Sequence, residues 1–431
     1  MESSFSGMRG IRESLQEQKN TMSVAGSGPG GLAAVAILVV IFSCLGSAER
    51  LQAGEEALCG DANGDSLVDL GDAVHVLTWL FRGGEAPLCG ELSCIDVNSD
   101  FEADLSDAVY LLEWLFLGGG DPACPGLRAG SYEVGHVALS FEDSPGSSGA
   151  IPIDVFYPAL EEGDGSEAAP GRFPLVVFGH GYNMETLDYA YLWELLVPAG
   201  YVFAISDRLS DTLVLDLDEY ALDLQFVLAR LKAEGEDRDS VFHGHLAGAS
   251  ALMGHSAGGG ASVLATARGL LDEELAIRTT VLLAPLGRTI SPVLGRRQPV
   301  DEAEDVDRPV LVFEGEKDCT TPPVFHSQPI FEALPRGGGS YLASLPLGDH
   351  CGFSDADGPT TISCGVAEVT LCNPFFPLIN FQGETLGSVE QTRIVGELTL
   401  AWFERHLRRT SDTMDLFEAA LSAEPVTWSR R

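Results

Sequence analysis

The sequence has few basic side chains: 25 Lys and Arg stand against 64 Asp and Glu, a formal net charge of −39 at pH 7. Proteins hold nucleic acid largely through Lys and Arg contacts with phosphates, and no basic stripe runs along this chain. A nucleic-acid partner is therefore excluded from the expected functions. Most of the carboxylates are expected to form a solvated surface, apart from two regularly spaced clusters near the amino terminus.

Long hydrophobic runs are also scarce. The apolar stretch at residues 32–45 is short for a membrane span, which needs about 20 apolar residues. Basic residues precede it and small residues ending at Ala48 follow it, a pattern typical of a secretion signal. We predict a signal peptide over residues 1–48, with the start codon at Met1 or further along, and a secreted, extracellular protein. A lipoprotein anchored at Cys44 is the alternative.

Cysteine is sparse, at nine residues in all. Cleavage near Ala48 removes Cys44 and leaves eight, an even number, in a compartment where disulfides persist. We therefore expect structural disulfides.

Residues 61–72, DANGDSLVDLGD, are echoed by residues 96–107, DVNSDFEADLSD, at an offset of 35 residues. An amphipathic helix pattern follows each copy and stops at a pair of glycines. Oxygen-bearing side chains at loop positions 1, 3, 5 and 12 suit a hard cation with six to eight ligands, such as calcium. The predicted ligands are Asp61, Asn63, Asp65 and Asp72 in the first loop and Asp96, Asn98, Asp100 and Asp107 in the second. Phe101 occupies the usual glycine position of the second loop, so that site is predicted to be weaker.

Residues 55–125 resemble a dockerin, a small all-α, EF-hand-like module. The resemblance implies structural calcium and a cohesin-type scaffold protein as partner. The pairs Leu70-Gly71 and Leu105-Ser106 depart from the Ser-Thr type that often contacts cohesin, which leaves the docking role open.

Four cysteines of this region follow the same repeat, since Cys59 corresponds to Cys94 and Cys89 to Cys124. The preferred pairing is Cys59 with Cys89 and Cys94 with Cys124. The alternative joins Cys59 to Cys124 and Cys89 to Cys94, and the sequence does not decide between them.

From residue 151 the chain alternates short apolar runs with longer helical stretches, which predicts a mostly parallel sheet covered by helices. The runs are IPIDVFYPA, FPLVVFGHG, YVFAISDR, SALMGHS, TTVLLAPL, PVLVFEGEKD and SYLASLPL. Chemistry is expected at the carboxyl ends of these strands. We assign residues 130–410 to this domain and residues 411–431 to a tail with a short helix and a loose end.

The fourth run leads into Gly254-His-Ser256-Ala-Gly258, followed by an Ala-rich helical stretch. A serine on a sharp turn between strand and helix exposes its hydroxyl, and the flanking glycines permit the turn. Ser256 is therefore the predicted nucleophile. The backbone N–H of Ala257, at the start of the helix, and that of Tyr182, in the His-Gly loop after the second run, are predicted to bind an oxyanion.

Three histidines follow the serine: His326, His350 and His406. His406 lies in a terminal amphipathic helix, and His326 lies eight residues beyond the expected acid. His350 lies in a loop after the last apolar run, so we predict it as general base. Asp318, which ends a buried strand in the turn GEKD, is the predicted acid that orients the imidazole.

Cysteines directly follow two of these residues. A bridge between Cys319 and Cys351 would brace the two loops and leave Cys364 to pair with Cys372. The alternative joins Cys351 to Cys364 and leaves Cys319 and Cys372.

Residues 130–410 resemble the branch of the α/β-hydrolases that contains chlorophyllases, platelet-activating-factor acetylhydrolases and cutinase-like polyester hydrolases. The resemblance is carried by VVFGHGYNM, GHSAGGG, VLVFEGEKDCTTPP and DHCGFSD. It implies an α/β-hydrolase fold and a serine esterase whose Ser-His-Asp triad hydrolyses an ester substrate without a catalytic cofactor. A lipase or polyester hydrolase, and an acetyl or feruloyl esterase acting on polysaccharides, are the alternatives. A non-catalytic, calcium-dependent binding protein is the most distant one.

Overall fold

The computed structural model describes residues 59–63, 67–84, 87, 95–98, 104–118, 122, 132–142, 144–146, 149–206, 216–269, 275–289, 297–355, 364, 385–408 and 413–431. The predicted signal peptide and the alternative anchor at Cys44 lie outside these residues. Among the described residues, no helix is both long enough and apolar enough to cross a membrane.

Two short helices carry the sequence repeat. In α3 (Leu70–Arg82), Asp69 caps the amino end by accepting a hydrogen bond from the Gly71 amide. Asp72 accepts one in return from the Asp69 amide, which completes a capping box. Gly83 ends the helix in the left-handed conformation, with φ 64°. In α5 (Leu105–Leu117) the same roles fall to Asp104, Asp107 and Gly118. The predicted helix and its glycine stop are present in both copies, whereas residues 64–66 and 99–103 of the predicted loops lie outside the described residues.

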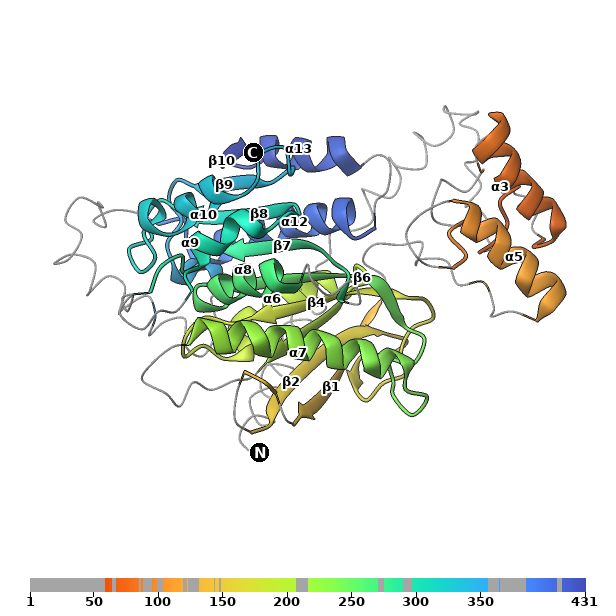
Figure 1. The fold of residues 1–431 in the computed structure, drawn as a ribbon, viewed down its shortest axis with the longest axis horizontal. Helices are drawn as coiled ribbons and strands as arrows, with labels where there is room; N and C mark the ends of the chain where they lie inside the picture. The colour runs from red at the N-terminus through yellow and green to blue at the C-terminus, as the bar shows by residue number, and fades with distance from the viewer. Residues whose placement is uncertain are drawn as a thin grey trace, which may run out of the picture. The chain divides into compact units, whose positions relative to one another are not determined.

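The rest of the described chain is built on one sheet of ten strands, in the order β10-β9-β8-β7-β6-β4-β5-β2-β1-β3 (Figure 1). The strands are β1 (Glu133–Phe141), β2 (Ile151–Ala159), β3 (Gly163–Asp164), β4 (Phe173–Gly179), β5 (Val202–Ser206), β6 (Leu246–His255), β7 (Ile277–Leu283), β8 (Val310–Gly315), β9 (Tyr341–Leu345) and β10 (Thr427–Arg430). The six strands from β5 to β9 in this order are parallel, whereas β2 runs antiparallel to both β5 and β1.

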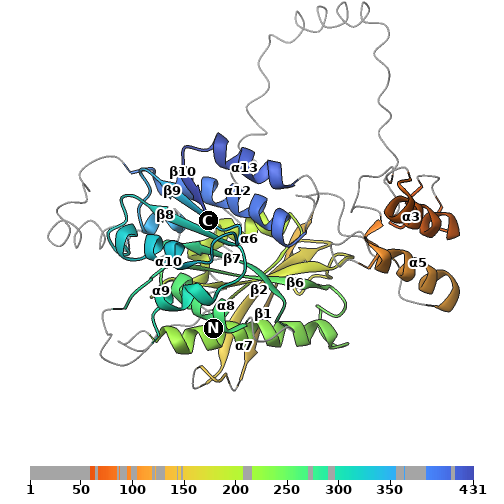
Figure 2. The ribbon, with the colours of Figure 1, turned by 45° about the horizontal axis from the view of Figure 1, so that its top comes forward.

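Helices cover both faces of the sheet, as Figures 1 and 2 show from two directions. The α-helices are α6 (Ala190–Leu196), α7 (Leu217–Glu236), α8 (Ala257–Gly269), α9 (Pro299–Glu302), α10 (Ser327–Ala333), α12 (Ser388–His406) and α13 (Thr413–Ala423). The 3₁₀ turns are η1 (Thr186–Tyr189), η4 (Ala303–Asp305), η5 (Pro323–Phe325) and η6 (Cys351–Phe353). Side chains alternate along each strand: Val176 and Phe178 of β4 join the core under α6, α12 and α13. Leu175 and Val177 face α7 and α8. The prediction of a mostly parallel sheet covered by helices is confirmed.

The carboxyl-terminal segment differs from the loose end that was expected for it. The predicted short helix is present as α13, but residues 427–430 form β10, which pairs antiparallel with β9 at the edge of the sheet. The ring of Trp428 lies 5.8 Å from that of Tyr341, and the Arg430 guanidinium lies 5.4 Å above the same ring. Contacts with a distant strand, rather than local hydrophobicity, therefore make this segment a strand.

A buried histidine joins three strands at the other edge of the sheet. His136 of β1 bonds Asp154 of β2 through Nε2 and Asp164 of β3 through Nδ1, both at 2.9 Å. Burial opposes the charged imidazolium, but the bonds and charges of the two carboxylates outweigh it, so the pKa of His136 is raised above 6.5. The imidazolium therefore stabilises the fold below the unfolded-state pKa, and this contribution is lost as pH rises through the folded-state pKa.

We expect His136→Gln to lower the free energy of unfolding most below about pH 6.5 and progressively less at higher pH. Urea unfolding of both proteins at a series of pH values from 5.5 to 9 measures this difference. A difference that stays constant, or that grows with pH, would contradict the raised pKa.

Candidate active site

The predicted nucleophile lies between a central strand and the helix that follows it. Ser256 comes directly after β6 and before α8, and its φ is 53°, a region that non-glycine residues rarely adopt. The Ser256 amide donates to the Leu283 carbonyl at 2.9 Å, and the Ser256 carbonyl accepts from the Leu286 amide at 2.8 Å. Backbone strain of this kind persists where the surroundings fix it, and it is common at functional sites.

The glycines around Ser256 allow two backbone segments to touch. A Cβ atom on Gly258 would lie 1.9 Å from the carbonyl oxygen of Gly179, which ends β4. A Cβ atom on Gly254 would lie 2.4 Å from the Gly258 carbonyl carbon. The turn at Ser256 is therefore pressed against the start of the loop that carries Tyr182, so the two segments predicted to bind an oxyanion lie side by side.

The structure brings the three predicted catalytic side chains together. His350 Nε2 lies 3.0 Å from Ser256 Oγ, and His350 Nδ1 lies 2.8 Å from Asp318 Oδ2. Asp318 and His350 follow the adjacent parallel strands β8 and β9, and both are almost fully buried. Ser256 is 9% exposed, so the solvent reaches the serine end of this chain of groups more than the aspartate end.

The loop of His350 is held from two sides. The Lys317 amide, next to Asp318, donates to the Gly348 carbonyl at 2.8 Å. Gln391, a buried residue of α12, accepts from the Asp349 amide at 3.1 Å and donates to the Asp349 carbonyl at 2.8 Å. The loop of His350 is therefore fixed by contacts with the turn after β8 and with a helix about forty residues further along the chain.

Thr321 is a site residue that the sequence analysis missed. Its amide donates to Asp318 Oδ1 at 2.7 Å, and its hydroxyl lies 2.8 Å from Asp318 Oδ2. The carboxylate thus has donors besides His350, which fix its orientation. Its position three residues after the aspartate is a local signal, because short polar side chains commonly bond backbone groups at this spacing.

The other two histidines after Ser256 have different surroundings. His326 Nδ1 accepts hydrogen bonds from the Gly287 and Arg288 amides at 3.1 and 3.4 Å. Burial lowers the pKa of His326 to about 4, so its imidazole is neutral near pH 7. The ring of His406 packs on Trp402, with the ring centres 4.1 Å apart. Both arrangements agree with the choice of His350 as base.

Tyr189 and His255 form a second buried network that sequence reasoning missed. The Tyr189 hydroxyl accepts a hydrogen bond from the Gly181 amide and forms another with His255 Nδ1, both at 2.9 Å. Burial first, and then the neighbouring His350, hold the pKa of His255 well below 6.5, so its imidazole is neutral near pH 7. The His255 ring lies 4.8 Å from that of His350. Tyr189 therefore ties the loop before Tyr182 to the turn that carries Ser256.

The predicted bridge between Cys319 and Cys351 is wrong, and with it the pairing of Cys364 with Cys372. Cys351 is bonded to Cys364, with the Cα atoms 5.8 Å apart, which is the alternative pairing. Cys319 is disulfide-bonded as well, and Cys372 lies outside the described residues. Asp318 and His350 meet, but the cysteine that follows each of them can point in another direction. Cys59 is also disulfide-bonded, but Cys89, Cys94 and Cys124 lie outside the described residues, so both pairings for this region stay predictions.

Several of the predicted calcium ligands are buried carboxylates. Asp72 is fully buried, and its Oδ1 accepts from the Asn63 amide at 3.1 Å. Burial, helped by the charge of Asp61, raises the pKa of Asp72 against the effect of backbone hydrogen bonds. Asp61, Asp96 and Asp107 are buried too. Within the described residues no group of three or more His, Cys, Asp or Glu side chains is arranged to hold a metal ion. Asp65 and Asp100 lie outside those residues.

A scan against models of protein families finds no match to this chain, and a search among curated proteins finds none either. The described residues define an α/β protein with a ten-stranded, mostly parallel sheet. A linked serine, histidine and aspartate lie at the carboxyl ends of three of its strands.

Proposed function

We propose that this chain is a secreted serine esterase with an α/β-hydrolase fold, which hydrolyses carboxylic esters through an acyl-enzyme intermediate. The proposal rests on the hydrogen bonds that link Ser256 Oγ to His350, at 3.0 Å, and His350 to Asp318, at 2.8 Å. The strained φ of Ser256 directly after β6 and an antiparallel β2 at the edge of a block of six parallel strands support the assignment.

The proposed reaction begins when Ser256 Oγ attacks the ester carbonyl while His350 Nε2 takes its proton. Asp318 stabilises the imidazolium that forms, and the amides of Tyr182 and Ala257 donate to the oxyanion. The imidazolium then gives its proton to the leaving alcohol, and the acyl group stays on the serine. Water, activated by His350, releases the carboxylic acid and restores the serine. This chemistry needs no cofactor.

Hydrolysis of p-nitrophenyl acetate, butyrate and decanoate by the mature protein, with and without EDTA, tests the proposal. Turnover that survives EDTA, together with an acyl group detected by mass spectrometry on the peptide of Ser256, is the expected result. Absence of turnover and of acylation on every ester would overturn the proposal and favour the non-catalytic, calcium-dependent binding protein.

The preferred substrate separates the alternatives within esterases. A lipase or polyester hydrolase is expected to favour decanoate and to release acid from polyester film. An acetyl or feruloyl esterase is expected to favour acetate and to act on substituted polysaccharide. The motifs of residues 130–410 include some that resemble polyester hydrolases, whereas the dockerin-like module at residues 55–125 favours an esterase that acts on polysaccharides.

We also propose that residues 55–125 are a dockerin-like module that binds structural calcium and docks on a cohesin-type scaffold. Exposed large apolar side chains commonly mark an interaction site, and here they recur at equivalent positions of α3 and α5. The pairs are Leu70 and Leu105, Val74 and Val109, and Phe81 and Phe116, each between 44% and 66% exposed.

Calcium titration of the EDTA-treated full chain is expected to show two sites, the second weaker because Phe101 takes the usual glycine position. Asp72→Ala should remove the stronger site and Asp107→Ala the weaker one, because each supplies the last ligand of its loop. Asp301→Ala, a change at an exposed carboxylate of the sheet domain, is the control and should keep both. The same stoichiometry in all four proteins, or no binding in any, would contradict the proposed ligands.

A further inference from the structure

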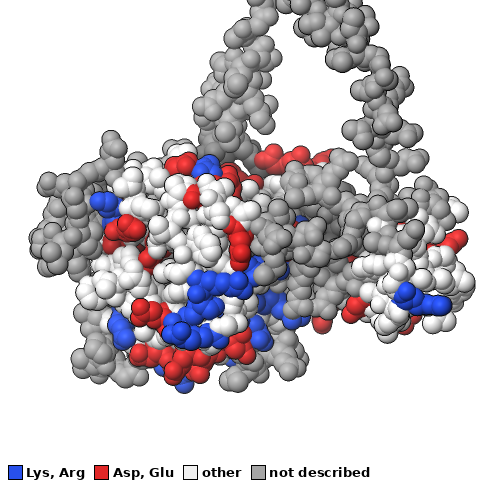
Figure 3. All heavy atoms as spheres, turned by 90° about the horizontal axis from the view of Figure 1, so that it is seen from above, with Lys and Arg blue, Asp and Glu red and all other residues white. Residues whose placement is uncertain are grey.

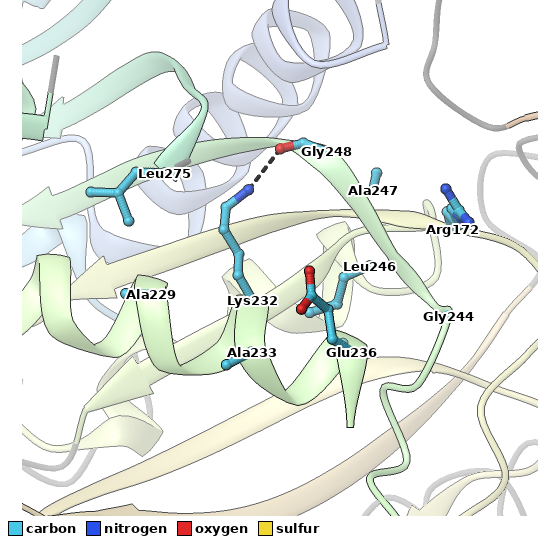
Figure 4. A pocket seen from close by; sticks show the side chains of 11 residues that line it. Arg172, Ala229, Lys232, Ala233, Glu236, Gly244, Leu246, Ala247, Gly248 and Leu275 are labelled. Carbon is cyan, nitrogen blue, oxygen red and sulfur yellow. Dashed lines mark hydrogen bonds between the residues drawn. The ribbon is translucent and has the colours of Figure 1, made fainter. Parts of the chain in front are cut away.

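A cavity of about 690 Å³ lies at the amino end of β6, between this strand and the second half of α7. Figure 4 shows Lys232 and Glu236 rising from α7 toward the strand that carries Gly248. Ser256 follows the opposite end of the same strand, and ten extended residues span about 33 Å. The cavity is therefore separate from the candidate active site.

The cations around this cavity lack the ion pairs found elsewhere in the molecule. Figure 3 shows basic side chains beside acidic ones on one face, and Arg393, for example, bridges three glutamates. Lys232 donates to the Gly248 carbonyl at 2.7 Å. Within the described part of the chain, neither Lys232 nor the cavity-lining Arg172 takes part in an ion pair. A chain with so large an acidic excess thus holds two cations without ion pairs at one cavity.

Burial of Lys232, together with the nearby charge of Arg278, lowers the pKa of its ammonium to about 8. A bound anion would offset that repulsion. It would also accept hydrogen bonds from the two ammonium N–H groups of Lys232 that do not bond the Gly248 carbonyl. Glu236 is the one carboxylate that lines the cavity, so Lys232 and Arg172 together exceed it by a single positive charge. A monoanion therefore matches the cavity better than a phosphate dianion does. Leu246 and Leu275 add apolar surface to the lining.

We propose that this cavity is a binding site for a small organic monocarboxylate with a short apolar chain. Lys232 holds the carboxylate, Arg172 adds positive charge from the other side of the cavity, and the apolar chain lies against Leu246 and Leu275. The inference does not rest on the proposed esterase activity, because none of these residues touches Ser256, His350 or Asp318 within the described structure.

Acetylation of lysine by an N-hydroxysuccinimide ester provides a readout besides activity, because the chain has only three lysines: Lys19, Lys232 and Lys317. The full mature chain with Ser256→Ala is labelled at pH 7.5 and constant ionic strength, with sodium hexanoate, acetate or phosphate added. Peptide mass spectrometry gives the rate at Lys232 against Lys317 as internal reference. A bound carboxylate raises the pKa of Lys232. Each pKa unit lowers the fraction of unprotonated, reactive amine about tenfold.

Hexanoate is expected to slow acetylation of Lys232 by about tenfold in a saturable manner, acetate to act only at higher concentration, and Lys317 to be unaffected. Arg172→Gln should raise the hexanoate concentration needed for the effect several-fold, whereas Arg238→Gln, a change at an exposed arginine outside the cavity, should leave it unchanged. Equal effects of hexanoate and phosphate would overturn the proposal, as would equal slowing at Lys232 and Lys317 or no effect of any anion.

Discussion

His350→Gln is expected to lower kcat on p-nitrophenyl butyrate by about 10⁴-fold or more, with a much smaller change in KM. The imidazole is the group that bonds Ser256 Oγ, at 3.0 Å, and glutamine cannot take up the proton that the serine releases. Its side chain can still bond Asp318 and fill much of the space, so the fold should persist. Initial rates at pH 8 and a circular dichroism melt of the same sample measure both effects.

The matched control is His326→Gln. His326 is a half-buried histidine near Asp318, but its Nδ1 accepts from backbone amides and its pKa is lowered to about 4 by burial. A glutamine oxygen can replace that acceptor, so kcat should fall by less than about tenfold. If the two variants lose the same activity, or if His326→Gln loses more, the assignment of the base is wrong.

The parts of the fold that could be predicted from the sequence are those with a strong local signal. Strand β2 was expected with the bounds that the structure shows, and β4 to β9 appear within the predicted apolar runs or a few residues from them. Parallel central strands are buried on both faces, so every residue of β4 is apolar or glycine. The turn at Ser256 is equally local, since two glycines and one serine define it.

The parts that could not be predicted depend on contacts between distant segments. All four residues of β10 are exposed, and the segment is a strand because it pairs with β9. Tyr189 meets His255 across 66 positions of sequence, and Gln391 meets Asp349 across 42. No spacing rule reveals such pairs. The wrong disulfide has the same origin, because loop packing decides where the Cys351 side chain points.

Gly258→Ala is expected to lower the free energy of unfolding by about 3 kcal/mol or more, the upper range for overpacking. Helix propensity alone predicts the opposite, since alanine in place of glycine inside a helix such as α8 stabilises it by about 1 kcal/mol. The steric effect should dominate because the new Cβ would lie 1.9 Å from the Gly179 carbonyl oxygen and 2.2 Å from its carbon. Neither backbone can yield without moving the turn of Ser256 away from the loop of Tyr182, so activity should fall as well.

Two further glycines make this a graded test by urea unfolding. In Gly259→Ala the nearest backbone atoms lie 3.0 Å from the new Cβ, and in Gly248→Ala nothing lies within 4 Å. The expected order of destabilisation is therefore Gly258, then Gly259, then Gly248, with the last within about 1 kcal/mol of the unmodified protein. A Gly258→Ala protein as stable as Gly248→Ala would mean that β4 and the Ser256 turn are not in backbone contact. The oxyanion site proposed between Tyr182 and Ala257 would then lose its structural basis, even if Ser256 and His350 proved essential.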